Sequence, residues 1–543
     1  MITLYGNLQY LGIIILLSLV LGGCSSDGSR ELGREGYIGG FIGGVAADEP
    51  RAALEGQKIL SAGGNAVDAA TAVYFTLAVT LPSRASLGGG GICMVLDQKT
   101  KNILALDFLS RVPLNIPKTA SRPSAVPGNP LGFFLLHNRF GRFQWESLVA
   151  IGEKLARFGT MTSRVLINDL VPVATALMAD PESRRVFLQK NGNLISEGTL
   201  IRQLNLASVL SQLKQSGPSE LYRGTLSRKF VEGVERAGGS LSSVDLASFK
   251  PKWKKVLSRK FGNHEINFAP PPASGGLVSA QMFGMLEKND LFEDASTNEK
   301  YHILVETALR SLIDRNRWLR DDFSIANSPQ ELISDAHLGN LMRNYRADRH
   351  LLPNQHSPPS KNRAENPSAT SFVVVDRDGS AVSCSLTMNN NFGTGRMVKG
   401  TGILLAAAPT DRAKGPTALS PIIVRNRNTN NLFFVGAVSG GIAAPTALVN
   451  VISRSMIGNK RLSEAISMAR VHHSAIPDIT YYEPNLAKVV KSFLIQRGHQ
   501  IAATPTLGFV NAIYCSGGLP IDPDTCIVKS DPRGNGLATS TGE

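Results

Sequence analysis

Residues 62–108 read AGGNAVDAATAVYFTLAVTLPSRASLGGGGICMVLDQKTKNILALDF, and this stretch predicts the architecture of the chain. An amphipathic run that starts at Glu49 breaks at residues 62–65, and a second helix-like run covers Ala66 to Val79. Two runs of strand character follow, 92–97 and 103–108, with turn residues between them. This order indicates two packed helices that lie against a sheet.

The rest of the chain extends the same pattern. Residues 131–250 are mainly helical in pattern, strands alternate with turns from Ser368 onward, and a helical block covers Pro445 to Arg470. The whole predicts a mixed α/β sandwich of layers. The glycine run 88–91 is not a phosphate loop, because it opens a strand and lacks the following Lys-Ser/Thr. We expect it to let backbones approach closely.

The composition describes a globular protein that is basic but has no nucleic-acid signature. The 543 residues are 43% hydrophobic and 18% charged, which excludes disorder of the whole and allows a large core. The net charge of +14 comes from Lys and Arg that are scattered along the chain. Without clustered basic residues interleaved with aromatics, the charge indicates a solvated surface, and we expect no nucleic-acid partner.

The N-terminus resembles an export signal. The apolar run from Leu11 to Leu21 is too short to span a bilayer but fits the core of a signal peptide, although no Lys or Arg precedes it. It ends in Leu-Gly-Gly-Cys, which is similar to a bacterial lipobox. We therefore predict a signal peptide over residues 1–23, lipidation at Cys24, a flexible tether over 24–44, and a lipid-anchored or periplasmic protein of the bacterial cell envelope. A cleaved signal without lipidation, or a buried strand, is the alternative.

The other cysteines fit an exported chain. Cys515 and Cys526 flank a turn-rich stretch that can bring them into bridging range, so we predict a disulfide between them. Cys93 and Cys384 lie in apolar runs, and we expect them to be small buried residues. No Cys/His spacing typical of zinc occurs, so we expect no metal and no cofactor.

Many short motifs occur in the order of one known family. They are GGNAVDAA (63–70), GGGG (88–91), ALDF (105–108), VPG (126–128), LYRG (221–224), PPPASGG (270–276), DRDGSAV (376–382), NNNFG (389–393), LSP (419–421), GG (440–441) and SDPR (530–533). By these motifs the chain resembles the gamma-glutamyltranspeptidases over about residues 45–533.

The resemblance implies a fold and a chemistry. The fold is a four-layer αββα sandwich of the N-terminal-nucleophile hydrolase type, one domain built from a large-subunit-like region (45–369) and a small-subunit-like region (370–543). Such a proenzyme cuts itself, and the new N-terminal threonine attacks the gamma-amide of glutathione-like substrates, with its own α-amine as general base. Gly440 and Gly441 match the oxyanion-hole glycines, and Thr387 and Asn389 match the residues that bond to and steady the nucleophile.

The chain departs from the family at the nucleophile. Counting back from Asp376, the first residue of the DRDG motif, places the nucleophile at Ala369, which cannot attack a carbonyl. Thr370 is the candidate replacement, but a slip of one residue turns a strand side chain to the opposite face unless a bulge compensates. Ser371 would share the face of Ala369 but would require cleavage two residues later.

The substrate pocket departs too. Leu109 stands where the family has the arginine that binds the α-carboxylate, and Ala406–Ala408 stand where the family has an aspartate. Thr417 stands at the first of two family serines, and Arg111 or Asp411 could supply displaced charges if they are not solvated surface residues. Arg111 and Thr417 are therefore the substrate-binding candidates.

Two functions remain open from the sequence. The first is an amidohydrolase or acyltransferase that uses Thr370 on a small-molecule amide or peptide. The second is an uncut, inactive family member with a binding or structural role in the cell envelope.

The lipidation site can be tested by substitution. Cys24→Ala should release the mature protein from the membrane fraction, because the acyl-bearing thiol is its predicted anchor. Fractionation with acyl labelling checks this, and equal labelling and membrane association in parent and variant would show that the anchor lies elsewhere.

Overall fold

The computed structural model describes residues 40–353, 368–410 and 418–540. Cys24, Asp411 and Thr417 lie outside these ranges, as does the predicted signal peptide. The first strand, β1 (Gly43–Ala47), begins inside the predicted tether of residues 24–44, so the folded body starts slightly earlier than expected. None of the helices within the described ranges is long and apolar enough to cross a bilayer.

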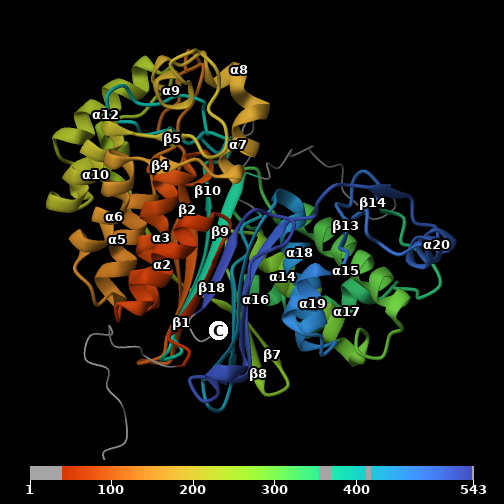
Figure 1. The fold of residues 1–543 in the computed structure, drawn as a ribbon. Coiled ribbons are helices and arrows are strands. Elements are labelled where there is room, and N and C mark those ends of the chain that lie inside the picture. Colours follow the sequence, from red (N-terminus) through yellow and green to blue (C-terminus); the bar gives the residue numbers. More distant parts are fainter. Residues whose placement is uncertain (1–39, 354–367, 411–417, 541–543) are drawn as a thin grey trace, which may run out of the picture. The chain divides into compact units, whose positions relative to one another are not determined.

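Two antiparallel sheets pack face to face in the middle of the fold (Figure 1). In spatial order, the strands of the first sheet are β18 (Leu537–Ser540), β1, β9 (Ala369–Asp376), β10 (Ala381–Thr387), β2 (Gly90–Asp97), β3 (Asn102–Phe108) and β6 (Lys252–Lys255). Those of the second sheet are β17 (Cys526–Lys529), β16 (Phe509–Leu519), β12 (Leu432–Ser439), β11 (Ile422–Asn426), β8 (His264–Phe268) and β7 (Leu257–Phe261).

Helices cover the outer face of each sheet (Figure 1). On the side of the first sheet they are α2 (Pro50–Ser61), α3 (Ala66–Thr80), α4 (Pro82–Ala85), α5 (Asn129–Phe140), α6 (Trp145–Phe158), α7 (Arg164–Leu170), α8 (Ala174–Leu177), α9 (Pro181–Phe187), α10 (Leu204–Ser216), α11 (Ser219–Tyr222), α12 (Thr225–Arg236) and α13 (Ser243–Ser248). On the side of the second sheet they are α14 (Gly275–Glu287), α15 (Thr297–Trp318), α16 (Pro329–Leu332), α17 (Asp335–Met342), α18 (Ala444–Met456), α19 (Leu462–Ser467) and α20 (Lys488–Gln496).

Short strands complete the description. They are β4 (Thr160–Met161) with β5 (Leu200–Ile201), and the small sheet of β13 (Val471–His473), β14 (Thr480–Tyr482) and β15 (Ile501–Ala503).

The helix pair predicted from residues 49–81 forms because each helix has a strong start. Glu49 caps α2 by accepting the N–H of Ala52 at 2.8 Å. Asn65 and Asp68 form a reciprocal capping box at the start of α3, so the Gly-Gly-Asn break becomes the turn between the two helices. Every residue of α3 is buried, since the helix lies between the first sheet and the other helices.

Three hydrophobic cores separate four layers. Phe372 and Val374 of β9 belong to the core between the first sheet and its helices. Val373 and Val375 belong to the core between the two sheets. Phe434 of β12 belongs to the core under the helices of the second sheet. The αββα sandwich that the resemblance implies is therefore the observed fold.

Two disulfides link neighbouring strands. Cys515 and Cys526, the pair singled out from the sequence, join β16 to β17. Cys93 of β2 and Cys384 of β10 face each other in the first sheet and are also bonded. Both cysteines are buried, as expected. Their disulfide was not foreseen, because strand pairing brings together positions that lie 291 residues apart.

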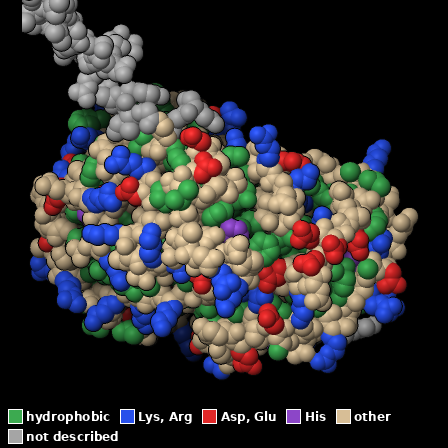
Figure 2. Space-filling model, turned by 90° about the horizontal axis from the view of Figure 1, so that it is seen from below, with side chains coloured by type: hydrophobic (Ala, Val, Ile, Leu, Met, Phe, Trp, Pro, Cys, Tyr) green, Lys and Arg blue, Asp and Glu red, His purple; other side chains and the backbone are tan. Residues whose placement is uncertain are grey.

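The surface agrees with the scattered charge of the sequence. On the face shown in Figure 2, Lys and Arg side chains are spread among acidic and hydrophobic ones and do not gather into one patch.

Candidate active site

The two faces of β9 determine which side chains can act at its start. β9 pairs with β10 residue by residue, from Ala369 opposite Thr387 to Val375 opposite Ala381, without a register shift. Side chains of a strand alternate between faces. Ala369 therefore lies in the core between the sheets, and Thr370 shares the helix-facing side with Phe372.

The start of β9 has an open edge because β1 ends early. The last paired residue of β1 is Ala47, opposite Phe372. Asp48 then turns away from the sheet after one more hydrogen bond, from its N–H to the carbonyl of Ser371. The backbone of Ala369 consequently has no β1 residue beside it.

A buried carboxylate occupies the place where β1 leaves. Asp48 Oδ2 accepts the hydroxyl of Thr370 at 3.2 Å, the N–H of Ser371 at 2.9 Å and the hydroxyl of Ser439 at 2.9 Å. Its Oδ1 accepts the side-chain amide of Asn511 at 2.7 Å. Asp48 thus ties β1 and β9 of the first sheet to β12 and β16 of the second.

Burial changes the acidity of this carboxylate. Removal from water raises the pKa of Asp48 above its ordinary value, although the charge of Arg84 and the hydrogen bonds from Ser371, Asn511 and Ser439 oppose the rise. A carboxylate with a raised pKa is a better proton acceptor when it is ionised.

Arg84 completes the open edge. Its Nη1 donates to the carbonyl of Ala369 at 3.2 Å. Its other nitrogens bind Asp169 of α7 in a two-pronged ion pair, with Nε to Oδ2 at 2.7 Å and Nη2 to Oδ1 at 2.6 Å. Asp169 is held in turn by the hydroxyl of Ser83 at 2.7 Å. The guanidinium is therefore fixed in orientation and aimed at one backbone carbonyl.

A small cavity of about 120 Å³ adjoins this edge. Its lining residues are Asp48, Arg84, Val165, Asn168, Phe509, Ser530, Asp531, Arg533, Gly534, Asn535 and Gly536. The cavity has room for a few water molecules or a small polar group, since one water occupies about 30 Å³ of liquid.

Thr387 ends β10 opposite Ala369, and Asn389 follows it by two residues. Thr387 Oγ1 donates to the carbonyl of Ser368 at 3.2 Å and accepts the N–H of Asn389 at 2.9 Å. The Asn389 amide donates to Ser110 and to the carbonyl of Ala407. Its Oδ1 is buried without a hydrogen-bond partner in residues 40–353, 368–410 and 418–540. An acceptor left in this state costs about 1–3 kcal/mol.

The glycine pair directly follows the end of β12, whose last residue, Ser439, donates its hydroxyl to Asp48. Gly440 directly follows Ser439 and has a φ of 131°. A Cβ on Gly440 would lie 2.5 Å from the Cα of Gly508, so only glycine fits there. Gly441 begins a single 3₁₀ turn that leads into α18.

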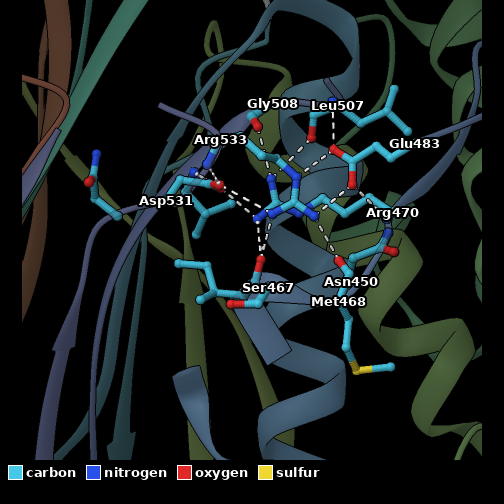
Figure 3. Close-up of polar contacts among 12 residues, drawn as sticks. Asn450, Ser467, Met468, Arg470, Glu483, Leu507, Gly508, Asp531 and Arg533 are labelled. Carbon is cyan, nitrogen blue, oxygen red and sulfur yellow. Dashed lines mark hydrogen bonds and ion pairs between the residues drawn. The ribbon is translucent and has the colours of Figure 1, made fainter. Parts of the chain in front are cut away.

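A network of two arginines and two carboxylates holds the loop that packs on Gly440 (Figure 3). Arg470 is fully buried, donates to the carbonyl of Gly508 at 2.9 Å and pairs with Asp531 at 2.6 Å. Arg533 binds both oxygens of Glu483 at 2.6 Å. These bonds anchor the C-terminal SDPR motif to the loop that contains Gly508.

The substrate-binding candidates are less well supported by the geometry. Arg111 pairs with the buried Asp107 at 2.7 Å and its side chain is 36% exposed. Leu109 is fully buried between the sheets. Ala406–Ala408 are also buried. The carbonyl of Ala407 accepts from the Asn389 amide, and its N–H donates to the carbonyl of Met388. Thr417 lies outside the described residues.

Sequence reasoning missed Asp48, Arg84 and Asn511. Asp48 is an acid between the apolar strand 45–47 and the helix that follows, and Arg84 is the one charged residue in the stretch 77–87. A charge in such a position signals a buried partner, but the chain alone does not reveal which.

Two clusters of histidines and carboxylates lie apart from this site, where α15 packs against the small sheet of β13, β14 and β15. The first is His302, Glu306 and His499, and the second is His350, His473 and Asp478. Hydrogen bonds already engage these atoms. The N–H of Ala475 donates to His473 Nδ1 at 3.0 Å, so neutral His473 carries its proton on Nε2, which donates to Asp478. A metal could not bind that nitrogen, and the absence of a metal stays a prediction.

His350 is the ionic centre of these clusters. It bonds to Glu306 at 2.7 Å and to Asp478 at 2.9 Å. Burial alone would lower the pKa of His350, but its two carboxylate partners raise it above the ordinary value.

Comparison with known proteins places the chain in one family. The model of the gamma-glutamyltranspeptidase family matches residues 52–541. The glutathione hydrolase proenzyme of Pseudomonas aeruginosa is 30% identical over 544 residues, which cover 91% of this chain and 94% of that protein. The glutathione hydrolase proenzyme of Escherichia coli is 27% identical over 533 residues, 90% of each chain.

The fold is shared with solved structures. The cephalosporin acylase of Bacillus halodurans superimposes with a TM-score of 0.80 at 20% identity, over 95% of this chain and 98% of that one. The likeness at this identity concerns the fold alone.

The ion pairs of His350 predict a pH-dependent stability. Because the folded pKa is raised, their stabilisation is fully present below the unfolded pKa of about 6.5 and is lost as pH rises through the folded value. The difference in unfolding free energy between the parent and His350→Gln should therefore shrink from pH 6.5 to pH 9, as denaturant titrations can measure. His472→Gln is the control, because burial lowers the pKa of His472 to about 3 and its difference should not shrink over that range.

The place of Ala369 predicts a new cleavage position in a variant. In Ala369→Thr the new hydroxyl would lie between the sheets, beside Thr387, which already binds the carbonyl of Ser368. We expect this variant to cut itself between residues 368 and 369, giving a small chain that begins at position 369. Ala369→Val has the same shape without the hydroxyl and should give no such cut. Intact-mass analysis would contradict the expectation if both variants behave alike.

Proposed function

Because the chain belongs to the gamma-glutamyltranspeptidase family, we propose that it is an N-terminal-nucleophile amidohydrolase or acyltransferase whose nucleophile is Thr370, released by self-cleavage of the Ala369–Thr370 bond. One observation carries the proposal: the hydroxyl of Thr370 donates to the buried carboxylate of Asp48 at 3.2 Å. A hydroxyl is a weak nucleophile, and an adjacent base is what activates it.

This contact removes an obstacle that the strand pattern raised. Thr370 does not share the face of Ala369, and the register of β9 contains no bulge that would rotate it. Thr370 still contacts a carboxylate, because Asp48 lies at the open edge of β9. From there Asp48 accepts the hydroxyl of Thr370 and that of Ser439 on the second sheet. The nucleophile therefore needs no bulge to have a base.

After cleavage, the α-amine of Thr370 takes over as general base, as in other N-terminal nucleophiles. The oxyanion of the acyl intermediate then requires N–H donors, and Gly440 and Gly441 are the candidates. Their neighbour Ser439 shares Asp48 Oδ2 with Thr370, which supports a location close to the nucleophile.

The substrate is a small-molecule amide or peptide, either a gamma-glutamyl compound or a related acyl amide. The named relatives are glutathione hydrolases. In this chain the family arginine is replaced by the buried Leu109, and Ala406–Ala408 replace the family aspartate. Each missing ionic hydrogen bond lowers affinity by about 1.5–3 kcal/mol. These losses favour an acyl amide that lacks a free amino acid end.

A second candidate is an uncut family member with a binding or structural role in the cell envelope. The observation that favours it is Ala369, which lies between the sheets at the nucleophile's place with no hydroxyl to attack the preceding carbonyl. The Oδ1 of Asn389, which has no hydrogen-bond partner among the described residues, fits the loss of that hydroxyl.

We also propose export and lipid anchoring through Cys24. The lipobox-like residues 21–24 support the anchor. The Cys93–Cys384 and Cys515–Cys526 disulfides support an oxidising compartment.

Self-cleavage distinguishes the two candidates. We expect the purified parent to consist of two chains, the smaller one beginning at Thr370, and Thr370→Ala to remain a single chain because it lacks the attacking hydroxyl. Thr370→Ser keeps a hydroxyl and should still be cut. Intact-mass analysis and N-terminal sequencing provide the measurement, and a parent that remains whole would favour the uncut candidate.

A further inference from the structure

We propose that Arg84 stabilises the oxyanion of self-cleavage at the Ala369–Thr370 bond, while Asp48 accepts the proton of the Thr370 hydroxyl. This inference rests on the proposed function and assigns two catalytic residues that lie outside the family motifs quoted above. Asp169 is a positioning residue, since it acts through Arg84.

Arg84 binds the one oxygen on which charge would develop. Attack on the carbonyl carbon of Ala369 turns its oxygen into an oxyanion, and Arg84 Nη1 already donates to that oxygen at 3.2 Å. A fixed cation stabilises such charge best when it needs no reorganisation. The ion pair with Asp169 supplies that rigidity, because it engages both Nε and Nη2 and leaves Nη1 directed at the carbonyl.

The attacking group and its base lie at the same edge. Thr370 Oγ1 is the atom that must bond to the carbon of Ala369, and its hydrogen already points to Asp48 Oδ2. Burial raises the pKa of Asp48, which increases its affinity for that proton. Nucleophile, base and oxyanion donor thus surround a single peptide bond.

The open edge of β9 explains why these groups meet there. Ordinary sheet pairing would cover the carbonyl of Ala369 with a neighbouring strand. β1 ends at Ala47, opposite Phe372, and leaves this carbonyl to Arg84. Arg84 could serve only to satisfy a buried carbonyl, and the experiment below separates that role from a catalytic one.

The reaction balances with water as the only co-reactant. The Thr370 proton passes to Asp48 as Oγ1 bonds to the carbon of Ala369, and the carbonyl electron pair moves onto the oxygen held by Arg84. When the oxyanion collapses, the carbon–nitrogen bond breaks and the nitrogen of Thr370 takes the proton from Asp48. Water then hydrolyses the resulting ester, which yields the carboxylate of Ala369 and a free threonine hydroxyl. The cavity of about 120 Å³ that Asp48 and Arg84 line is a reservoir for this water.

The experiment follows the appearance of the two chains with time after cell-free synthesis of the full chain. The variants are Arg84→Gln, Arg84→Lys, Arg84→Gly and Asp48→Asn, with Thr370→Ala as the uncut reference. Arg164→Gln is the matched control, because Arg164 is an exposed arginine on the neighbouring helix α7 whose partner is Glu197. Melting temperatures report on folding.

We expect Arg84→Gln to slow cleavage by about 100-fold, as removal of an oxyanion donor does. Arg84→Lys should be slowed less, Asp48→Asn should be slowed strongly, and Arg164→Gln should match the parent. Guanidinium chloride, below the concentration that unfolds the chain, should restore cleavage in Arg84→Gly by entering the vacated space beside the cavity. A residue that only stabilises the fold would not be replaced by a free ion in this way.

The outcomes separate the inference from the proposed function. If the parent is cut, Thr370→Ala is not, and Arg84→Gln is cut at the parental rate, the role of Arg84 is wrong and the proposed function stands. If the parent stays whole, or Thr370→Ala is cut at the same bond, both fail. Where Arg84→Gln does not fold, because Asp169 has lost its cation, Arg84→Lys and the guanidinium rescue decide, and a folded Arg84→Gly that is not rescued overturns the inference.

Discussion

The alternation of side chains along β9 is the constraint on which the site depends. β9 lies between β1 and β10 in the first sheet, and its two faces border two different cores. An unbroken register with β10 leaves no freedom to rotate a single side chain from one face to the other. Ala369 is therefore committed to the space between the sheets, and Thr370 to the side of the helices. Self-cleavage by Thr370 therefore has to start from the helix-facing side of the strand.

The buried carboxylate of Asp48 contacts Thr370 without any change in the register of β9. A charge taken out of water is costly unless it is well paired, and Asp48 collects four donors from three strands of both sheets. This gathering fixes the exit of β1, the start of β9 and the end of β12 relative to one another. It also leaves the edge of Ala369 uncovered, so that the arginine of α4 can reach the backbone. Asp48 thus stabilises the junction of the two sheets and also accepts the hydrogen bond of the Thr370 hydroxyl.

The rest of the fold holds this junction in place. The Arg470–Asp531 and Arg533–Glu483 pairs fix the loop on which Gly440 packs, and the Cys93–Cys384 disulfide ties β10 to β2 at the centre of the first sheet. Leu109 and Ala406–Ala408, which stand where the resemblance implies charged residues, are buried and apolar.

The sequence by itself determined the layered fold, because periodicity, caps and turn residues act over a few neighbouring positions. The helix pair of residues 49–81, the strand pairs that follow, and the break at Gly63-Gly64-Asn65 all depend on such local signals. It also named Thr387, Asn389, Gly440 and Gly441 as candidate site residues, since motifs keep their order. Only the tertiary structure decided the surroundings of Thr370. Asp48 lies 322 positions away from Thr370, and Arg84 lies 285 positions away from Ala369. Contacts over such separations follow from strand order and from where β1 leaves the sheet, and no local pattern in the chain encodes either.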